Sequence, residues 1–134
     1  MLRISLRDGE KAIVNGAVLR ASGRVTLYLE NHAAILRGRD VMRPEEANTA
    51  ARQLYFACML AYIDPDGRDK HQQSILALIS AVVTTATDPR VHVACVRFAH
   101  EAARGDYYKA LSAARELIAC EAASLEPAVG AESA

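Results

Sequence analysis

The sequence predicts an α+β fold in which a small N-terminal antiparallel β-sheet packs against a C-terminal antiparallel bundle of about four helices. Apolar and polar side chains alternate over residues 2–7 and 24–29 with the two-residue period of strands. Apolar side chains recur at helical spacing over residues 49–125, where Asp, Pro and Gly divide the pattern. At 134 residues we expect a single domain, with a sheet module at 1–43, a helical bundle at 44–126 and a flexible tail at 127–134.

Four short strands joined by tight turns are expected in the first 31 residues. Asp8-Gly9 and Asn15-Gly16 are dipeptides favoured in two-residue hairpin turns, because Gly and Asn tolerate a positive φ. A third break follows at Ser22-Gly23, and residues 34–36 suit a fifth short strand.

One face of this sheet is expected to be basic. Arg3 and Arg7 alternate with apolar residues in the first strand, as Arg24 and Tyr28 do in the fourth, so paired strands place all four on one exposed face. Residues 1–43 contain eight Lys or Arg against four Asp or Glu, a net charge of +4 that the rest of the chain balances. Such a face suits an RNA backbone and a stacked base, and a solvated Arg-rich face is the alternative. The candidate RNA-binding residues are Arg3, Arg7, Lys11, Arg24, Tyr28, Arg37 and Arg39.

Capping and turn residues divide the helical half. A single helical turn is expected at 44–46, and a first long helix begins after Asn48 or Thr49 and runs to about residue 63. From residue 54 this helix is apolar nearly all round, which indicates a central position or an interface. A second helix is expected at 69–86. Asp88 with Pro89 opens a third, and Asp106 caps an amphipathic fourth at about 107–125.

No catalytic, metal or cofactor site emerges from the sequence. It contains no phosphate-binding Gly-rich loop, no G-x-S-x-G and no H-E-x-x-H. His92 and Cys95 share a predicted helix but provide too few ligands for zinc, and the three cysteines suit buried reduced thiols. No apolar run reaches the length of a membrane span and no signal peptide is evident, so we expect a cytoplasmic protein.

Three blocks of the chain resemble, in order, motifs of the flagellar-biosynthesis repressor FlbT family of α-proteobacteria. The first resembles the family's L-x-x-G-E-[KR]-x-x-[IV]-N-G, and the last its G-D-x-Y-K-A-L-x-x-A-R-x-L-I. The middle block resembles A-I-L-R-x-x-D followed by T-x-A-[KR]-x-[IL]-Y, with Ala50 where the family usually carries Pro. The matching positions are Leu6, Gly9, Glu10, Lys11, Val14, Asn15, Gly16, residues 34–37, Asp40, Thr49, Ala51, Arg52, Leu54, Tyr55, Gly105, Asp106, Tyr108, Lys109, Ala110, Leu111, Ala114, Arg115, Leu117 and Ile118.

This resemblance implies a post-transcriptional repressor that associates with the 5′ untranslated region of flagellin mRNA and promotes its degradation. It also implies a functional link to the small flagellar protein FlaF. The N-terminus is similar, over a shorter stretch, to the carbon-storage-regulator family of mRNA-binding repressors, whose arginines at strand edges bind RNA. That second resemblance points to Arg7.

A protein-interaction module is the main rival to RNA binding. An acidic helical half with an apolar first helix and an amphipathic last helix is suited to binding flagellin or FlaF by helix-in-groove packing, although core packing explains the same pattern. The RNA sequence motif and the oligomeric state are left open.

Overall fold

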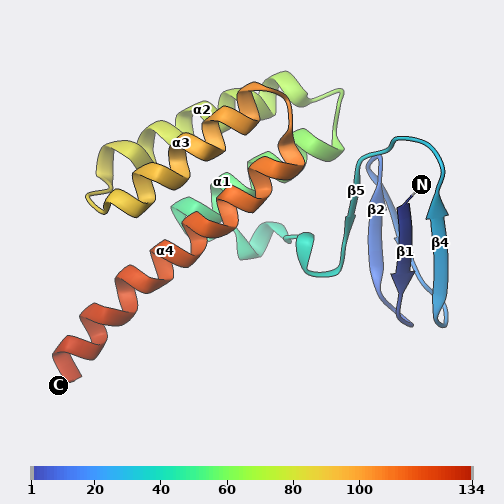
Figure 1. The fold of residues 1–134 in the computed structure, drawn as a ribbon, viewed down its shortest axis with the longest axis horizontal. Helices are drawn as coiled ribbons and strands as arrows, with labels where there is room; N and C mark the ends of the chain where they lie inside the picture. The colour runs from blue at the N-terminus through green and yellow to red at the C-terminus, as the bar shows by residue number, and fades with distance from the viewer. Residues whose placement is uncertain (1, 134) are drawn as a thin grey trace.

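The computed structural model describes the backbone of residues 2–133 and the side chains of residues 2–38 and 40–123. The predicted α+β fold is confirmed, with strands gathered at one end of the molecule and helices at the other (Figure 1). The strands are β1 (Leu2–Leu6), β2 (Lys11–Val14), β3 (Ala17–Arg20), β4 (Val25–Leu29) and β5 (Ile35–Arg37). The α-helices are α1 (Ala50–Ile63), α2 (Arg68–Thr85), α3 (Pro89–Ala103) and α4 (Tyr107–Ser133), with single 3₁₀ turns at Gly38–Asp40 and Pro44–Glu46.

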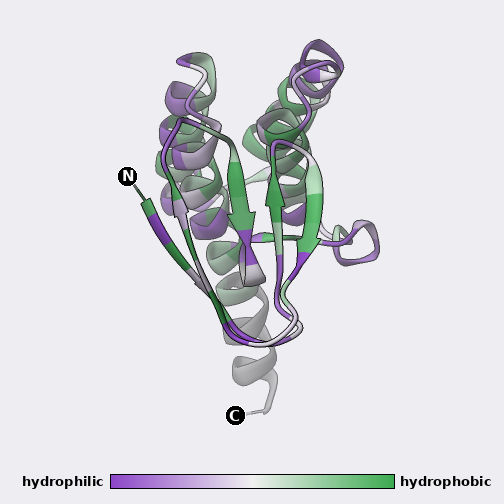
Figure 2. Cartoon of the chain, turned by 90° about the vertical axis from the view of Figure 1, so that its right-hand side faces the viewer, coloured by the Kyte–Doolittle hydropathy of each residue, from purple (hydrophilic) through white to green (hydrophobic). Residues whose placement is uncertain are grey.

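The strands form two small antiparallel sheets in separate layers. β1 pairs with β4, and β2 pairs with β3 on one side and β5 on the other. Ile4 and Leu6 of β1 pack against Ala12 of β2, whereas the next residue, Ile13, packs into the helical core. Because successive side chains of a strand point to opposite faces, β2 is covered by β1–β4 on one side and by helices on the other. Figure 2 shows the strands lying in front of the helices.

The hairpin predicted at Asp8-Gly9 is wrong. This dipeptide does form a turn, with Gly9 at φ +79°, but the strands on its two sides belong to different sheets. The N–H of Gly9 donates to the carbonyl of Ala21 at 2.8 Å, which extends the pairing of β2 with β3, whereas β1 pairs with β4. The hairpin at Asn15-Gly16 is confirmed, because Val14 and Ala17 pair directly on either side of it.

The predicted caps define the helix starts. Thr49 accepts a hydrogen bond from the N–H of Arg52 at 3.2 Å, and Asp88 and Asp106 cap α3 and α4 in the same way.

The backbone of α4 continues to Ser133, beyond the end predicted near residue 125. The predicted flexible tail at 127–134 lies outside the residues whose side chains are described.

The helices share one core with the inner sheet. The central position predicted for α1 is confirmed, because it packs against both α2 and α4, and α3 packs mainly against α4. Leu36 of β5 is fully buried with Leu54 of α1, Phe98 of α3 and Leu111 of α4.

Over the residues described here, no helix has the length and apolar character needed to cross a membrane.

One hydrogen bond and one polar cluster fix the sheet end of the molecule on the helices. The hydroxyl oxygen of Tyr62 in α1 accepts a hydrogen bond from the N–H of Ile35 at 3.1 Å. Arg115 of α4 pairs with the carboxylate of Asp40 and donates to the hydroxyl of Tyr55 at 3.1 Å, and that hydroxyl donates to the Asp40 carbonyl at 2.8 Å. The sheet end of the molecule is therefore held at a defined position on the bundle.

Candidate nucleic-acid interface

The outer sheet, which we call the β1–β4 ribbon, presents a basic face. Arg3 lies opposite Tyr28 in the antiparallel register, so these two side chains share one face of the ribbon, as predicted. Arg7 and Arg24 continue the chain directly beyond the last pair of the same register and are exposed. The opposite face carries Ile4 and Leu6, which are buried. Burial of the apolar face against the inner sheet thus turns the arginines toward solvent.

The guanidinium groups on this face are not neutralised by direct pairing. Among the side chains that the structure describes, no carboxylate forms an ion pair with Arg3, Arg7 or Arg24. The nearest acids in the sequence are engaged with backbone groups instead. Asp8 accepts a hydrogen bond from the N–H of Gly23 at 2.7 Å, and Glu10 accepts one from the N–H of Arg7 at 2.9 Å. The three cations remain available to an external anion.

The other candidate cations lie elsewhere. Lys11 pairs with Arg20 across β2 and β3 and shares its face with Ile13, so it is turned away from the ribbon. Arg37 lies opposite Ala12 on the ribbon side of β5, and its Nη1 donates to the carbonyl of Ser5 at 3.1 Å. The side chain of residue 39 is outside the described part of the chain. The structure therefore brings Arg37 close to β1 and leaves Lys11 on a different face.

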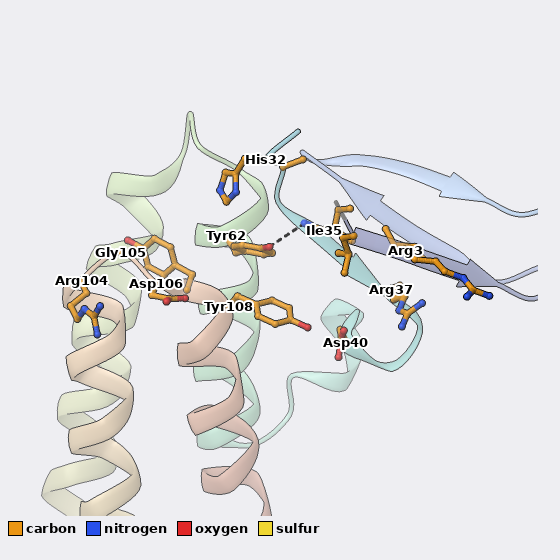
Figure 3. Close-up of a pocket in the computed structure, with 14 residues that line it drawn as sticks. Arg3, His32, Ile35, Arg37, Asp40, Tyr62, Arg104, Gly105, Asp106 and Tyr108 are labelled. Carbon is orange, nitrogen blue, oxygen red and sulfur yellow. Dashed lines mark hydrogen bonds between the residues drawn. The ribbon is translucent and has the colours of Figure 1, made fainter. Parts of the chain in front are cut away.

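A cleft of about 690 Å³ separates the ribbon from the ends of the helices. Arg3 and Arg37 line its sheet side, and Tyr62 and Tyr108 line its helix side (Figure 3). The two tyrosine rings have centroids 5.8 Å apart and planes tilted by 46°. The sequence-based prediction missed both tyrosines. Tyr108 falls outside the apolar stripe of α4 that begins at Tyr107. This position in the helical pattern could have indicated an exposed aromatic side chain.

Most other polar groups around the cleft already have partners within the protein. Burial raises the pKa of Tyr62, which keeps its hydroxyl neutral, and its oxygen accepts the hydrogen bond from Ile35. Asp40 pairs with Arg115, and Arg104 donates to Glu101 at 3.4 Å. The cations left over lie on the sheet side, so the cleft is basic on one wall and aromatic on the other.

Polar residues of the helical half form caps rather than a reactive cluster. Asp64 accepts hydrogen bonds from the N–H of Gly67 at 3.3 Å and from His71 at 2.9 Å, and these bonds hold the pKa of its carboxyl below the usual range. In the ranges that the structure describes, no three His, Cys, Asp or Glu side chains lie close enough together to hold a metal ion.

Comparison with known proteins decides the family. The family profile described as "Flagellar protein FlbT" matches residues 2–125, nearly the whole chain. This chain belongs to the FlbT family. It is 35% identical over 121 residues to the flagellum biosynthesis repressor protein FlbT of Caulobacter vibrioides, covering 90% of this chain and 86% of that protein. The names of this family and of its relatives describe a flagellar protein that represses flagellum biosynthesis.

Two further relatives give similar figures. The probable flagellum biosynthesis repressor protein FlbT of Caulobacter sp. K31 is 33% identical over 90% of this chain and 92% of its own length. That of Agrobacterium fabrum is 34% identical over 90% of this chain and 80% of its own length. No solved structure matches this FlbT chain.

Proposed function

We propose that this FlbT chain represses flagellin synthesis after transcription, by binding the 5′ untranslated region of flagellin mRNA through the β1–β4 ribbon and promoting degradation of the message. The relatives are named flagellum biosynthesis repressors, which supports the repressor role. The observation that carries the RNA-binding step is the exposed face on which Arg3 lies opposite Tyr28, with the exposed Arg7 and Arg24 directly beyond the paired strands. Among the side chains that are described, none of these three arginines has a carboxylate partner. In this proposal the protein acts in the cytoplasm, where it binds flagellin mRNA.

In this proposal the guanidinium groups bind phosphates of a single-stranded or looped leader, and a base stacks on Tyr28. Phosphate contacts supply affinity without sequence choice, whereas stacked and splayed bases are the usual targets of sequence-specific RNA recognition. Stacking contributes about 1–3 kcal/mol per base, so Tyr28 alone would discriminate poorly. Tyr28 is 57% exposed, and its ring is accessible to such a base.

Degradation of the message is proposed to be indirect. The described polar groups of the ribbon are arginines, a tyrosine and hydroxyls, none of which is arranged with a general base or a carboxylate cluster. Binding of the leader would expose the message to a cellular nuclease or recruit one. The proposed role is therefore that of a regulator without catalytic activity of its own.

Binding of a labelled flagellin leader across a series of salt concentrations tests the proposal. About four phosphate contacts, from Arg3, Arg7, Arg24 and Arg37, predict a slope near −3 when the logarithm of the binding constant is plotted against that of the salt concentration, because each contact contributes about −0.7 for single strands. Replacing Arg3, Arg7 and Arg24 together by Ala should weaken binding and flatten this slope. A control that replaces Arg52, Lys70 and Arg90 on the helices removes the same charge and should leave both the affinity and the slope nearly unchanged. A flat salt response of the wild-type protein, or equal losses in both variants, contradicts the proposal.

A second candidate function is binding of flagellin or FlaF by the helical bundle. The apolar α1 helix that suggested this role is buried in the core, so α1 itself offers no docking surface. Exposed apolar side chains on the neighbouring helices favour the candidate instead, since Leu76 of α2 is 67% exposed and Val96 of α3 is 70% exposed. Capture of FlaF or flagellin by the wild-type chain, lost in Leu76→Asp and Val96→Asp variants, would support it.

A further inference from the structure

The cleft beside the ribbon has the size and chemistry of a ligand site. Its volume of about 690 Å³ falls within the range of about 300–1,000 Å³ that small-molecule sites occupy. It lies between β1, β5 and the turn that joins α3 to α4 (Figure 3). Neither the family name nor the proposed role of the ribbon requires such a cleft.

The charge left within the cleft is positive and lies on one wall. Asp40 pairs with Arg115, and Asp106 forms an ion pair with the Nζ of Lys109 at 3.8 Å. Arg3 forms no ion pair with any carboxylate described, and Arg37 uses one N–H on a carbonyl, which leaves its charge uncompensated. A phosphate placed between these two arginines would meet two guanidinium groups.

The opposite wall is aromatic and held in place. Tyr62 is fixed by its hydrogen bond to the backbone of β5, and the Tyr108 ring lies against it at a centroid distance of 5.8 Å. Tyr108 is nevertheless 52% exposed. One edge of its ring is supported by Tyr62, and the remainder is open for a planar group to stack on.

The cleft is continuous with the ribbon at Arg3. This residue lies opposite Tyr28 on the exposed face of the ribbon and also lines the cleft. A strand whose backbone follows the arginines of the ribbon would therefore reach the cleft at Arg3. His32 and Asp106 line the cleft as well and offer hydrogen-bonding groups to the edge of an inserted base.

We propose that this cleft binds one nucleotide of single-stranded RNA, with its base stacked on Tyr108 and its phosphate between Arg3 and Arg37. This inference rests on the proposed RNA binding and adds the place where a base is recognised. An inserted base whose edge meets fixed polar groups gives the sequence choice that a single exposed tyrosine on the ribbon does not.

A single-stranded RNA oligonucleotide with one 2-aminopurine in a uridine tract provides the probe. Stacking on an aromatic side chain quenches 2-aminopurine fluorescence, and the chain contains no Trp that would obscure the signal. Wild-type protein should quench the probe. Tyr108→Ala and Tyr108→Leu should each remove most of the quenching and weaken binding about five-fold or more, and Tyr108→Phe, which keeps the ring, should retain both. Tyr108→Leu keeps the apolar bulk of the side chain, so it is expected to fold like wild type. An unchanged midpoint of urea unfolding verifies this.

The outcomes separate this inference from the proposed function. If Arg24→Ala weakens binding while Tyr108→Ala and Tyr108→Leu bind and quench like wild type, the cleft is not a base site and the ribbon proposal still holds. If Tyr28→Ala removes the quenching and Tyr108→Ala does not, the base stacks on the ribbon and the inference is overturned. If the wild-type protein binds neither this probe nor a flagellin leader, both proposals fail.

Discussion

The hydroxyl of Tyr62, in the last turn of α1, accepts a hydrogen bond from the backbone N–H of Ile35 at 3.1 Å, and this bond links the inner sheet to the helical bundle. Tyr62→Phe removes the acceptor and leaves a half-buried N–H without a partner, which should lower the free energy of unfolding by about 1–2 kcal/mol. Urea unfolding measures the loss. Tyr108→Phe is the matched control, because no hydrogen bond involves that hydroxyl among the described residues, and it should unfold like wild type. Equal stability of the two variants would contradict the assigned role of Tyr62.

The turn at Gly16 gives a second prediction, because the end of α1 approaches it closely. Gly16 has φ +85°, and a Cβ added there would lie 3.0 Å from the carbonyl oxygen of Ile63. Gly16→Ala should therefore lower stability by about 1–3 kcal/mol, combining backbone strain with a forced displacement of α1. Gly23 has a similar φ of +75° with nothing near its added Cβ, so Gly23→Ala measures the strain alone. The prediction fails if thermal unfolding shows Gly23→Ala to be the more damaging change.

The pH dependence of stability should include a contribution from Asp64. Its hydrogen bonds to His71 and to the N–H of Gly67 hold its pKa below the ordinary value of 3.8 in the folded state. As the pH falls through about 4, the unfolded chain binds this proton before the folded protein does, so stability is lost on the acid side. The difference in unfolding free energy between wild type and Asp64→Asn should shrink between pH 5 and pH 3. Asp66→Asn, in the same turn, should follow wild type in parallel. A difference for Asp64→Asn that is independent of pH would exclude this linkage.

The buried thiol of Cys58 should be inert in the folded protein. Its side chain is fully buried and donates a long hydrogen bond to the carbonyl of Tyr107 at 3.5 Å, and burial raises its pKa to about 12. At pH 8 only about one thiol in ten thousand would be ionised. A thiol reagent should label the half-buried Cys120 first and label Cys58 only at the rate of unfolding, as read by peptide mass spectrometry. Native labelling of Cys58 as fast as that of Cys120 would show the core to be more open than described.

Local signals in the sequence predicted most of the backbone. Asn15-Gly16 forms the predicted hairpin because Asn15 at φ +50° and Gly16 tolerate the conformation that the turn requires. Thr49, Asp88 and Asp106 cap the helices that they were expected to cap, because capping depends on N–H groups within three residues. These are interactions over a short stretch of chain, and the sequence specifies them directly.

The same local signals do not predict which strands pair when they lie far apart in the sequence. The turn at Asp8-Gly9 is compatible with a hairpin, but β1 pairs with β4, and no dipeptide indicates which of several alternating strands will be the partner. The basic face was nevertheless predicted correctly for Arg3 and Tyr28, since the alternation within each strand does not depend on the partner chosen. The cleft was not predicted, because Tyr62 and Arg37 are 25 residues apart and meet only when the layers stack.

Photochemical crosslinking of the protein to a flagellin leader, with the attached peptides located by mass spectrometry, tests the central claim most directly. The account predicts crosslinks in β1 and β4, near Tyr28 and Arg3, with a further site at Tyr108 if the cleft holds a base. Crosslinks confined to α2 and α3, or none above the level of an unrelated protein, would contradict RNA binding by the ribbon.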